Sequence, residues 1–371
     1  MLLIFCALVS TGALWGIETV AHSKHRLSVL LFLIWLFLFI VGNHEVADYG
    51  NYLIEYQRID WSGIRLNYWA FDFIQCISKS LGLSFDGFRA IIYMIGLFFV
   101  GVFVRKTSGW SILFFFFYSI YPMMIDAAQM KNFIAMAIFS YAMTFLRGHS
   151  VNNYIKYMFY SFLAAGFHIA ILIFFPLIIF KKLIHAKYFT RVFLLCIIAT
   201  SLILSIGSFN ESIKSVLIIF FSGELESKVD EVFSNTVRFG YLIYYVATFL
   251  AFLIIRWIHK SVKYIKNISE IQKDFIDNAY VCSIYAFSFF PFYMVWSEFS
   301  RFFRDLFLIF SAAVVIGIQI CAPKFKYYAI TDKQVKLFFS YLVLLFYLFY
   351  FGIYVYFDII IYPLFNLNVW L

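Results

Sequence analysis

Long apolar runs dominate this chain, and short polar segments separate them. A helix that crosses a bilayer needs about 20 mainly apolar residues. Such runs cover residues 2–20, 26–42, 88–105, 110–126, 132–146, 154–180, 189–208, 238–257, 279–297, 302–321 and 336–358. They are continuous rather than alternating, which favours helices over the strands of a membrane barrel. The pattern predicts an all-α, polytopic transmembrane helical bundle with about 10–12 spans.

Composition supports a membrane protein. Hydrophobic residues make up 64% of the 371 residues and charged residues 13%, against about 45–50% and 25% in soluble domains. A soluble fold could not bury that much apolar surface. The first run lacks a basic leader, and Glu18 stands where a cleavage site would need a small residue, so we interpret it as a span and not as a signal peptide.

The positions of the charges predict an orientation. Nineteen of the 29 basic residues lie in six connections between the runs, and such residues collect on the cytoplasmic side. The two longer connections, 43–87 and 209–237, carry eleven acidic residues. We therefore expect one integral membrane domain, 1–371, with both loops and both termini outside. The net charge of +9 then reflects membrane topology and does not indicate nucleic-acid binding.

Two segments need a special interpretation. Run 154–180 has basic residues at both ends, so a re-entrant hairpin that turns near Gly166 and His168 would restore the alternation, although a single tilted helix is the alternative. In the first outer loop, apolar residues recur at helical spacing from Tyr68 to Leu81. This stretch is either a helix in the outer interface or a loop helix packed on the bundle.

Several mechanisms lack their motifs. The sequence has no Walker loop, no GxGxxG after a strand, no HExxH and no GxSxG, so nucleotide-driven and zinc chemistry are unsupported. The five cysteines form no CxxC pair, which argues against a disulfide framework or a zinc site. We expect no metal and no cofactor.

Polar groups at membrane depth are costly and are therefore functional candidates. Gln129, Lys131 and Asn132 lie between two spans whose connection faces outward. Lys131 there could hold an anionic ligand, with free N–H groups at the helix start favouring phosphate. The alternative is a lysine that snorkels to lipid phosphates.

A second cluster stands at the outer end of a later span. It contains Glu298, Arg301, Arg304 and Asp305. Arginine forks suit phosphate oxygens, whereas in a helix Glu298, Arg301 and Asp305 could instead form a structural ladder of ion pairs.

His168 and the segment around Asp48 complete the candidates. His168 has few polar neighbours in its run and could move a proton or bind a sugar hydroxyl, or simply bond to another helix. Asp48, Tyr49 and Tyr52 follow a span on the outer side. They could bind sugars, or form an interfacial aromatic belt with a helix cap at Asp48.

Four short elements occur in a fixed order along the chain. They are D-Y-x-x-Y at Asp48, Tyr49 and Tyr52, shortly after Gly42; Gln129-Met130-Lys131-Asn132-Phe133-Ile134-Ala135, similar to Q-x-R-N/Q-x-I-A; the pair Phe167-His168; and Arg301 followed by Phe302. Together they resemble the EpsG-like branch of bacterial Wzy-type polysaccharide polymerases. Lys131 departs from the usual Arg, and the Arg that often precedes the loop's Gly is missing.

The resemblance implies a membrane glycosyltransferase with a GT-C-like architecture in the bacterial cytoplasmic (inner) membrane. Members join repeat units carried on undecaprenyl diphosphate into O-antigen, capsule or exopolysaccharide on the outer face. The implied partners are the glycan donor and acceptor, membrane lipids, a chain-length regulator and a flippase. The glycosyl–diphosphate bond supplies the energy, so no cofactor is required.

The residues then take hypothetical roles. Lys131, Arg301 and Arg304 would stabilise the departing diphosphate, with Gln129 and Asn132 beside them. Asp48, Glu298 or His168 would accept the proton. Rival functions are a lipid-linked oligosaccharide flippase and another membrane transferase, such as an O-antigen ligase or an acyltransferase. No internal repeat typical of a transporter is evident,.

Overall fold

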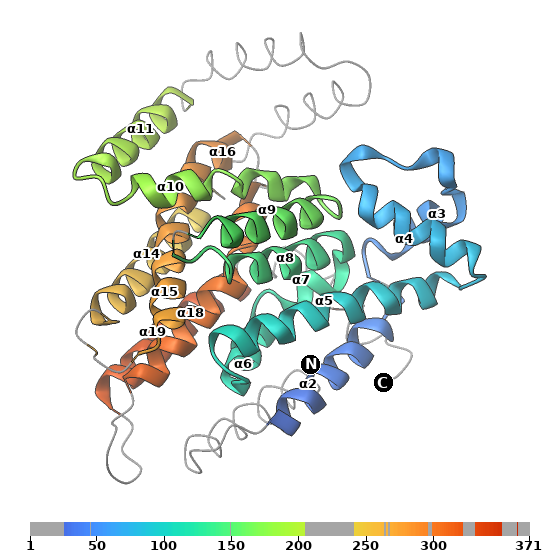
Figure 1. Ribbon diagram of the computed structural model, residues 1–371, viewed down its shortest axis with the longest axis horizontal. Coiled ribbons are helices and arrows are strands. Elements are labelled where there is room, and N and C mark those ends of the chain that lie inside the picture. Colours follow the sequence, from blue (N-terminus) through green and yellow to red (C-terminus); the bar gives the residue numbers. More distant parts are fainter. Residues whose placement is uncertain are drawn as a thin grey trace.

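The computed structural model describes residues 26–44, 46–148, 150–204, 241–262, 265, 268–295, 299–321, 331–350 and 362. Within these residues the chain is helical and contains no β-strand, which confirms the all-α fold class. The first predicted span and the whole of outer loop 209–237 fall outside the described residues. Figure 1 shows one bundle with a smaller helical lobe, containing α3 and α4, at one end.

The helices follow the predicted apolar runs. They are α2 (Arg26–Val41), α5 (Phe85–Thr107), α6 (Ile112–Ile120), α7 (Met123–Ala128), α8 (Met130–Met143), α9 (Val151–Ala165), α10 (Leu177–Leu183), α11 (Phe189–Leu204), α14 (Tyr241–Val262), α15 (Glu270–Tyr285), α16 (Phe290–Val295), α17 (Ser300–Arg304), α18 (Phe307–Ile320) and α19 (Asp332–Leu348). Three described helices, at 85–107, 242–262 and 300–320, are long and apolar enough to cross a membrane.

The bundle has two chemically different ends. Helices α5 and α8 run side by side in the same direction, since Tyr93 packs on Phe133 (ring centroids 5.5 Å apart) and, further along, the Lys106 Nζ donates to the Tyr141 hydroxyl at 3.0 Å. Basic Lys106 lies at one end. The other end of α5 begins at Phe85, whose ring meets that of Tyr49 in the outer loop at 5.1 Å.

Run 154–180 is not a single helix. Helix α9 ends at Ala165, and the chain turns through His168 into a 3₁₀ helix, η3 (Ile169–Phe174), followed by α10. The returning arm packs on α9, because the Tyr157 hydroxyl donates to the Phe174 carbonyl at 2.9 Å. The turn lies at the outer-loop end, and the arm returns to the basic end. The single tilted helix is therefore excluded, while the position of the turn relative to a bilayer stays a prediction.

Two other predicted spans are interrupted. Residues 110–126 form α6 and α7, which Tyr121 and Pro122 separate. Residues 279–297 contain the end of α15, the 3₁₀ helix η4 (Ala286–Phe289) and α16. Apolar composition alone does not reveal such breaks, because a buried helix end is as apolar as a buried helix interior.

The outer loop folds over the end of α8. It contains α3 (Tyr49–Arg58), two 3₁₀ turns, η1 (Trp61–Gly63) and η2 (Leu66–Tyr68), and α4 (Trp69–Ser80). Helix α4 buries Phe71 and Cys76 together with Asp72 and Gln75 and leaves Phe73 46% exposed. Its inward face therefore mixes apolar and polar side chains, as in a loop helix packed on the bundle, while its depth in a bilayer stays a prediction.

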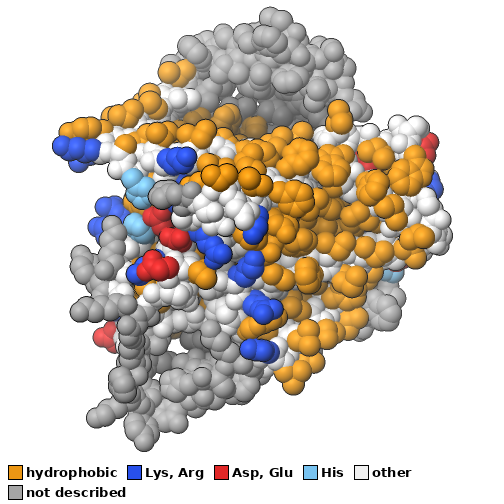
Figure 2. All heavy atoms as spheres, viewed as in Figure 1, with side chains coloured by type: hydrophobic (Ala, Val, Ile, Leu, Met, Phe, Trp, Pro, Cys, Tyr) orange, Lys and Arg blue, Asp and Glu red, His pale blue; other side chains and the backbone are white. Residues whose placement is uncertain are grey.

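The surface is consistent with a bilayer. Figure 2 shows a broad apolar face bordered along one side by Lys and Arg side chains. Exposed side chains on the long helices include Met94 and Phe98 of α5 and Phe339 and Val343 of α19. Broad exposed apolar faces mark contact with lipid or protein.

Candidate functional site

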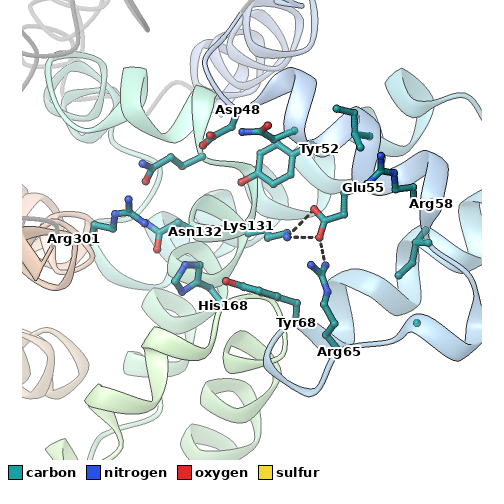
Figure 3. A pocket seen from close by; sticks show the side chains of 15 residues that line it. Asp48, Tyr52, Glu55, Arg58, Arg65, Tyr68, Lys131, Asn132, His168 and Arg301 are labelled. Carbon is teal, nitrogen blue, oxygen red and sulfur yellow. Dashed lines mark hydrogen bonds and ion pairs between the residues drawn. The ribbon is translucent and has the colours of Figure 1, made fainter. Parts of the chain in front are cut away.

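A cavity of about 720 Å³ lies between the outer loop and the bundle. Figure 3 shows its walls, which come from α3 and the 3₁₀ turns, the start of α8, the turn after α9, and α17. Seven of the eleven candidates from the sequence line it: Asp48, Tyr52, Gln129, Lys131, Asn132, His168 and Arg301. Residues more than 250 positions apart along the chain therefore share one cavity. The structure brings the candidates together but leaves their roles as proposals.

Lys131 occupies the first turn of α8 and reaches into the cavity. Its Nζ lies 2.8 and 2.9 Å from the two carboxylate oxygens of Glu55. The rings of Tyr68, Phe71 and Tyr52 surround the ammonium, with centroids 4.2, 4.9 and 5.4 Å away. Only 11% of the side chain is exposed. Lys131 is thus held in an aromatic cage, and the alternative of a lysine that snorkels to lipid is wrong.

Arg65 is a cavity residue that the sequence analysis missed. Its Nη2 pairs with the Glu55 carboxylate. Asp72 accepts three further hydrogen bonds from Arg65, from the backbone N and Nε at 2.9 Å each and from Nη2 at 2.6 Å. The Asp72 bonds, together with the nearby Glu55 charge, outweigh burial and raise the pKa of Arg65. The guanidinium is therefore a permanently charged wall of the cavity.

Glu55 joins the two cations (Figure 3). It lies on α3, 76 positions before Lys131. Its side chain is 18% exposed. Within the described chain it accepts hydrogen bonds from Lys131 and Arg65 alone. No local pattern could have identified it, because a single Glu in a loop helix is usually solvated.

His168 projects from the turn between α9 and η3. Its Nδ1 accepts a hydrogen bond from the Ala170 backbone N at 3.3 Å. Its ring meets that of Tyr68 edge-on, with centroids 5.9 Å apart. Because Nδ1 accepts this bond, the neutral imidazole carries its proton on Nε2 and is a donor there. This tautomer suits hydrogen bonding to a ligand oxygen better than accepting a proton.

A buried polar layer stands behind the cavity wall. Asn132 Nδ2 donates to Asp305 Oδ1 at 2.9 Å, and Arg304 Nη2 donates to Gln129 Oε1. Arg304 and Asp305 are 6% and 0% exposed. Arg304 therefore does not line the cavity, and in this structure it positions Gln129 instead. Within the described residues, Asn132 Oδ1 and Arg304 Nε are buried without a hydrogen-bond partner.

The D-Y-x-x-Y element divides between two environments. The Tyr49 hydroxyl donates to Asp86 at 3.1 Å, and its ring lies 4.7 Å from the Arg89 guanidinium. Tyr49 thus anchors the loop to α5 and does not line the cavity, whereas Asp48 and Tyr52 do. Asp48 is the N-cap residue of α3 but makes no capping hydrogen bond with its side chain. Glu298 lies outside the described residues.

The charges of the lining favour an anion. Four cations line the cavity, Arg58, Arg65, Lys131 and Arg301, against two carboxylates, Asp48 and Glu55. Asp72 adds a third carboxylate directly behind Arg65, so a positive excess of one remains. Within the described residues no group of three His, Cys, Asp or Glu side chains could hold a metal ion. A ligand with several anionic oxygens would complement this lining.

Comparison with known proteins gives one result. The sequence profile of the EpsG family matches residues 26–366, which is nearly the whole chain. No curated protein and no solved structure matches. The match agrees with the motifs at Asp48, Lys131, His168 and Arg301 and with the helical membrane fold. The chain therefore belongs to the EpsG family, a family of Wzy-like polysaccharide polymerases.

Proposed function

We propose that the chain is a membrane glycosyltransferase that joins oligosaccharide repeat units carried on undecaprenyl diphosphate. The polymer would be O-antigen, capsule or exopolysaccharide, made on the outer face of the bacterial cytoplasmic membrane. The observation that carries the proposal is the cation-rich cavity of an EpsG-family chain, which gathers Lys131, Arg301 and His168 from distant segments.

The location of the cavity supports the outer face. It adjoins the acidic loop 43–87 and the start of α5, whereas Arg105 and Lys106 lie in the last turn of α5. Basic residues mark the cytoplasmic side, so the cavity would open away from it. A helix of 23 residues spans about 34 Å, close to the thickness of the hydrocarbon core. Diphosphate headgroups at the outer surface would then be within reach.

In the proposed reaction the acceptor hydroxyl attacks the anomeric carbon of the donor sugar. The bond from that carbon to the diphosphate oxygen breaks, and negative charge grows on the leaving group. Lys131 and Arg301 would stabilise that charge from the cavity wall. His168 Nε2 and the Tyr52 hydroxyl would orient sugar or phosphate oxygens.

The test is complementation of a deletion strain with single variants, followed by a polysaccharide gel. Lys131→Ala and Arg301→Ala should each stop polymer growth while the protein stays in the membrane. Loss of one such contact costs about 2.7–4 kcal/mol of transition-state stabilisation. The matched control is Lys273→Ala, because Lys273 is a partly exposed lysine paired with Glu270 outside the cavity. Polymers of wild-type length from both cavity variants would contradict the proposal.

The rival functions predict different intermediates. A strain without a polymerase should accumulate single repeat units on the outer leaflet, whereas one without a flippase should accumulate them on the inner leaflet. A strain without an O-antigen ligase would instead accumulate finished polymer on its lipid carrier. Accumulation of single repeat units on the inner leaflet would indicate a transporter and contradict the polymerase function.

A further inference from the structure

Glu55 occupies an unusual place among the charged groups of the cavity. Both of its oxygens accept hydrogen bonds from Lys131, and Oε1 also accepts from Arg65. Two cations thus share one carboxylate at the cavity wall. A group in this position both neutralises the cations and competes with any anion that would bind them.

The two cations do not depend on Glu55 for their positions. Arg65 keeps its three hydrogen bonds to Asp72, which is fully buried. Lys131 keeps its aromatic cage, in which the Tyr68 ring is the nearest. If the Glu55 side chain swings away, both positive charges remain in place. The carboxylate is therefore the exchangeable partner, because both cations have other contacts that hold them in place.

A diphosphate is the stronger partner for such a pair. It offers more negative charge and more oxygens than one carboxylate, and it matches the guanidinium fork. Once displaced, Glu55 would lie beside the bound diphosphate without its two cationic partners. A carboxylate that loses cationic partners and gains an anionic neighbour becomes a stronger base. Donor binding would in this way activate a base beside the leaving group.

We propose that Glu55 accepts the proton of the acceptor hydroxyl, and that the donor diphosphate frees it by replacing it on Lys131 and Arg65. This inference rests on the polymerase function proposed above. The O–H bond of the acceptor breaks and its proton passes to the Glu55 carboxylate. The acceptor oxygen bonds to the anomeric carbon, and the diphosphate leaves with the electron pair of the broken C–O bond. No oxidant, metal or further reactant is needed.

The experiment uses the full chain in lipid nanodiscs and two readouts. The first is the affinity for farnesyl diphosphate, a short polyprenyl diphosphate used as the probe. The second is polymer formation from lipid-linked repeat units. Glu55→Gln should bind the probe at least as tightly as the wild type, because the competing charge is gone. It should polymerise about 10²–10⁴-fold more slowly, the usual contribution of a general base.

Glu55→Asp is the second variant, because it keeps the negative charge that balances Lys131. It should bind the probe like the wild type and polymerise faster than Glu55→Gln but slower than the wild type. Glu270→Gln is the matched control, since Glu270 forms an exposed ion pair with Lys273 outside the cavity, and both of its readouts should be unchanged.

The outcomes separate this inference from the function on which it rests. Failure of the wild type to bind farnesyl diphosphate would overturn the polymerase function and, with it, the role of Glu55. Probe binding by the wild type with full polymerisation by Glu55→Gln would overturn the role of Glu55 alone. Loss of probe binding in both variants would reduce Glu55 to a structural counter-ion and would also overturn the inference.

Discussion

Gly166 offers a precise test of how the hairpin supports the cavity. It follows the last residue of α9, and its carbonyl accepts hydrogen bonds from the backbone N atoms of Ala70, at 2.9 Å, and Phe71, at 3.4 Å. A Cβ atom at this position would lie 2.5 Å from the Trp69 Cε2 and 2.8 Å from the Ala70 Cβ. Gly166→Ala therefore pushes directly against the start of α4.

The geometry gives the size of the effect. Carbon atoms pack best at about 3.5–4.0 Å, so α4 and the hairpin turn must separate by about 1 Å. Overpacking of this kind costs about 1–3 kcal/mol of folding free energy. Tyr68 precedes α4 and His168 follows Gly166, and both line the cavity. A displacement of about 1 Å in a site can lower a rate about 10²-fold.

The assay combines polymer length on a gel with the thermal unfolding midpoint of the purified protein. Gly166→Ala should lower both. Gly50→Ala is the control in the same outer loop, because no atom lies within 4 Å of its added Cβ. Since Gly50 is exposed in the first turn of α3, this change should keep both the polymer and the unfolding midpoint normal. Normal polymer and normal stability in Gly166→Ala would refute the argument that α4 and the hairpin turn position the cavity.

Two further changes test the supports behind the wall. Asp72→Asn removes the buried charge that fixes Arg65 and should lower the free energy of unfolding by about 1–3 kcal/mol. Farnesyl diphosphate should bind more weakly in the nanodisc assay, and unchanged affinity would show that Arg65 is not a ligand group. Asp305→Ala leaves Asn132 Nδ2 buried without its acceptor and should lower the free energy of unfolding by about 1–3 kcal/mol. The unfolding midpoint measured in detergent should therefore fall, and an unchanged midpoint would argue against this network.

Much of the fold follows from the spacing of apolar residues. The spans at 26–42, 88–105 and 302–321 match α2, α5 and the α17–α18 segment, because lipid demands continuous helical hydrogen bonding. The breaks inside 110–126 and 279–297 were not predicted. They depend on tertiary packing between helices, which leaves no periodic signal in an evenly apolar stretch.

The sequence predicted those residues of the candidate site whose polar side chains are energetically costly in an apolar stretch. Lys131, Arg301 and His168 stand out because charged or polar groups are expensive in apolar surroundings, and all three line the cavity. Glu55 and Arg65 were missed because they lie in an ordinary polar loop, where a charged side chain costs nothing. Only the fold brings that loop against α8, where the charges of Glu55 and Arg65 become part of the cavity wall beside Lys131.

This arrangement also bears on the departure of Lys131 from the arginine usual in the family motif. A lysine is a point charge and lacks the planar fork that holds two phosphate oxygens. In this structure Arg65 supplies a guanidinium that shares the Glu55 carboxylate with Lys131. In the proposed site the fork therefore comes from the outer loop and the point charge from α8. The pair would give a diphosphate both bidentate geometry and a concentrated charge, which one arginine at position 131 could not supply alone.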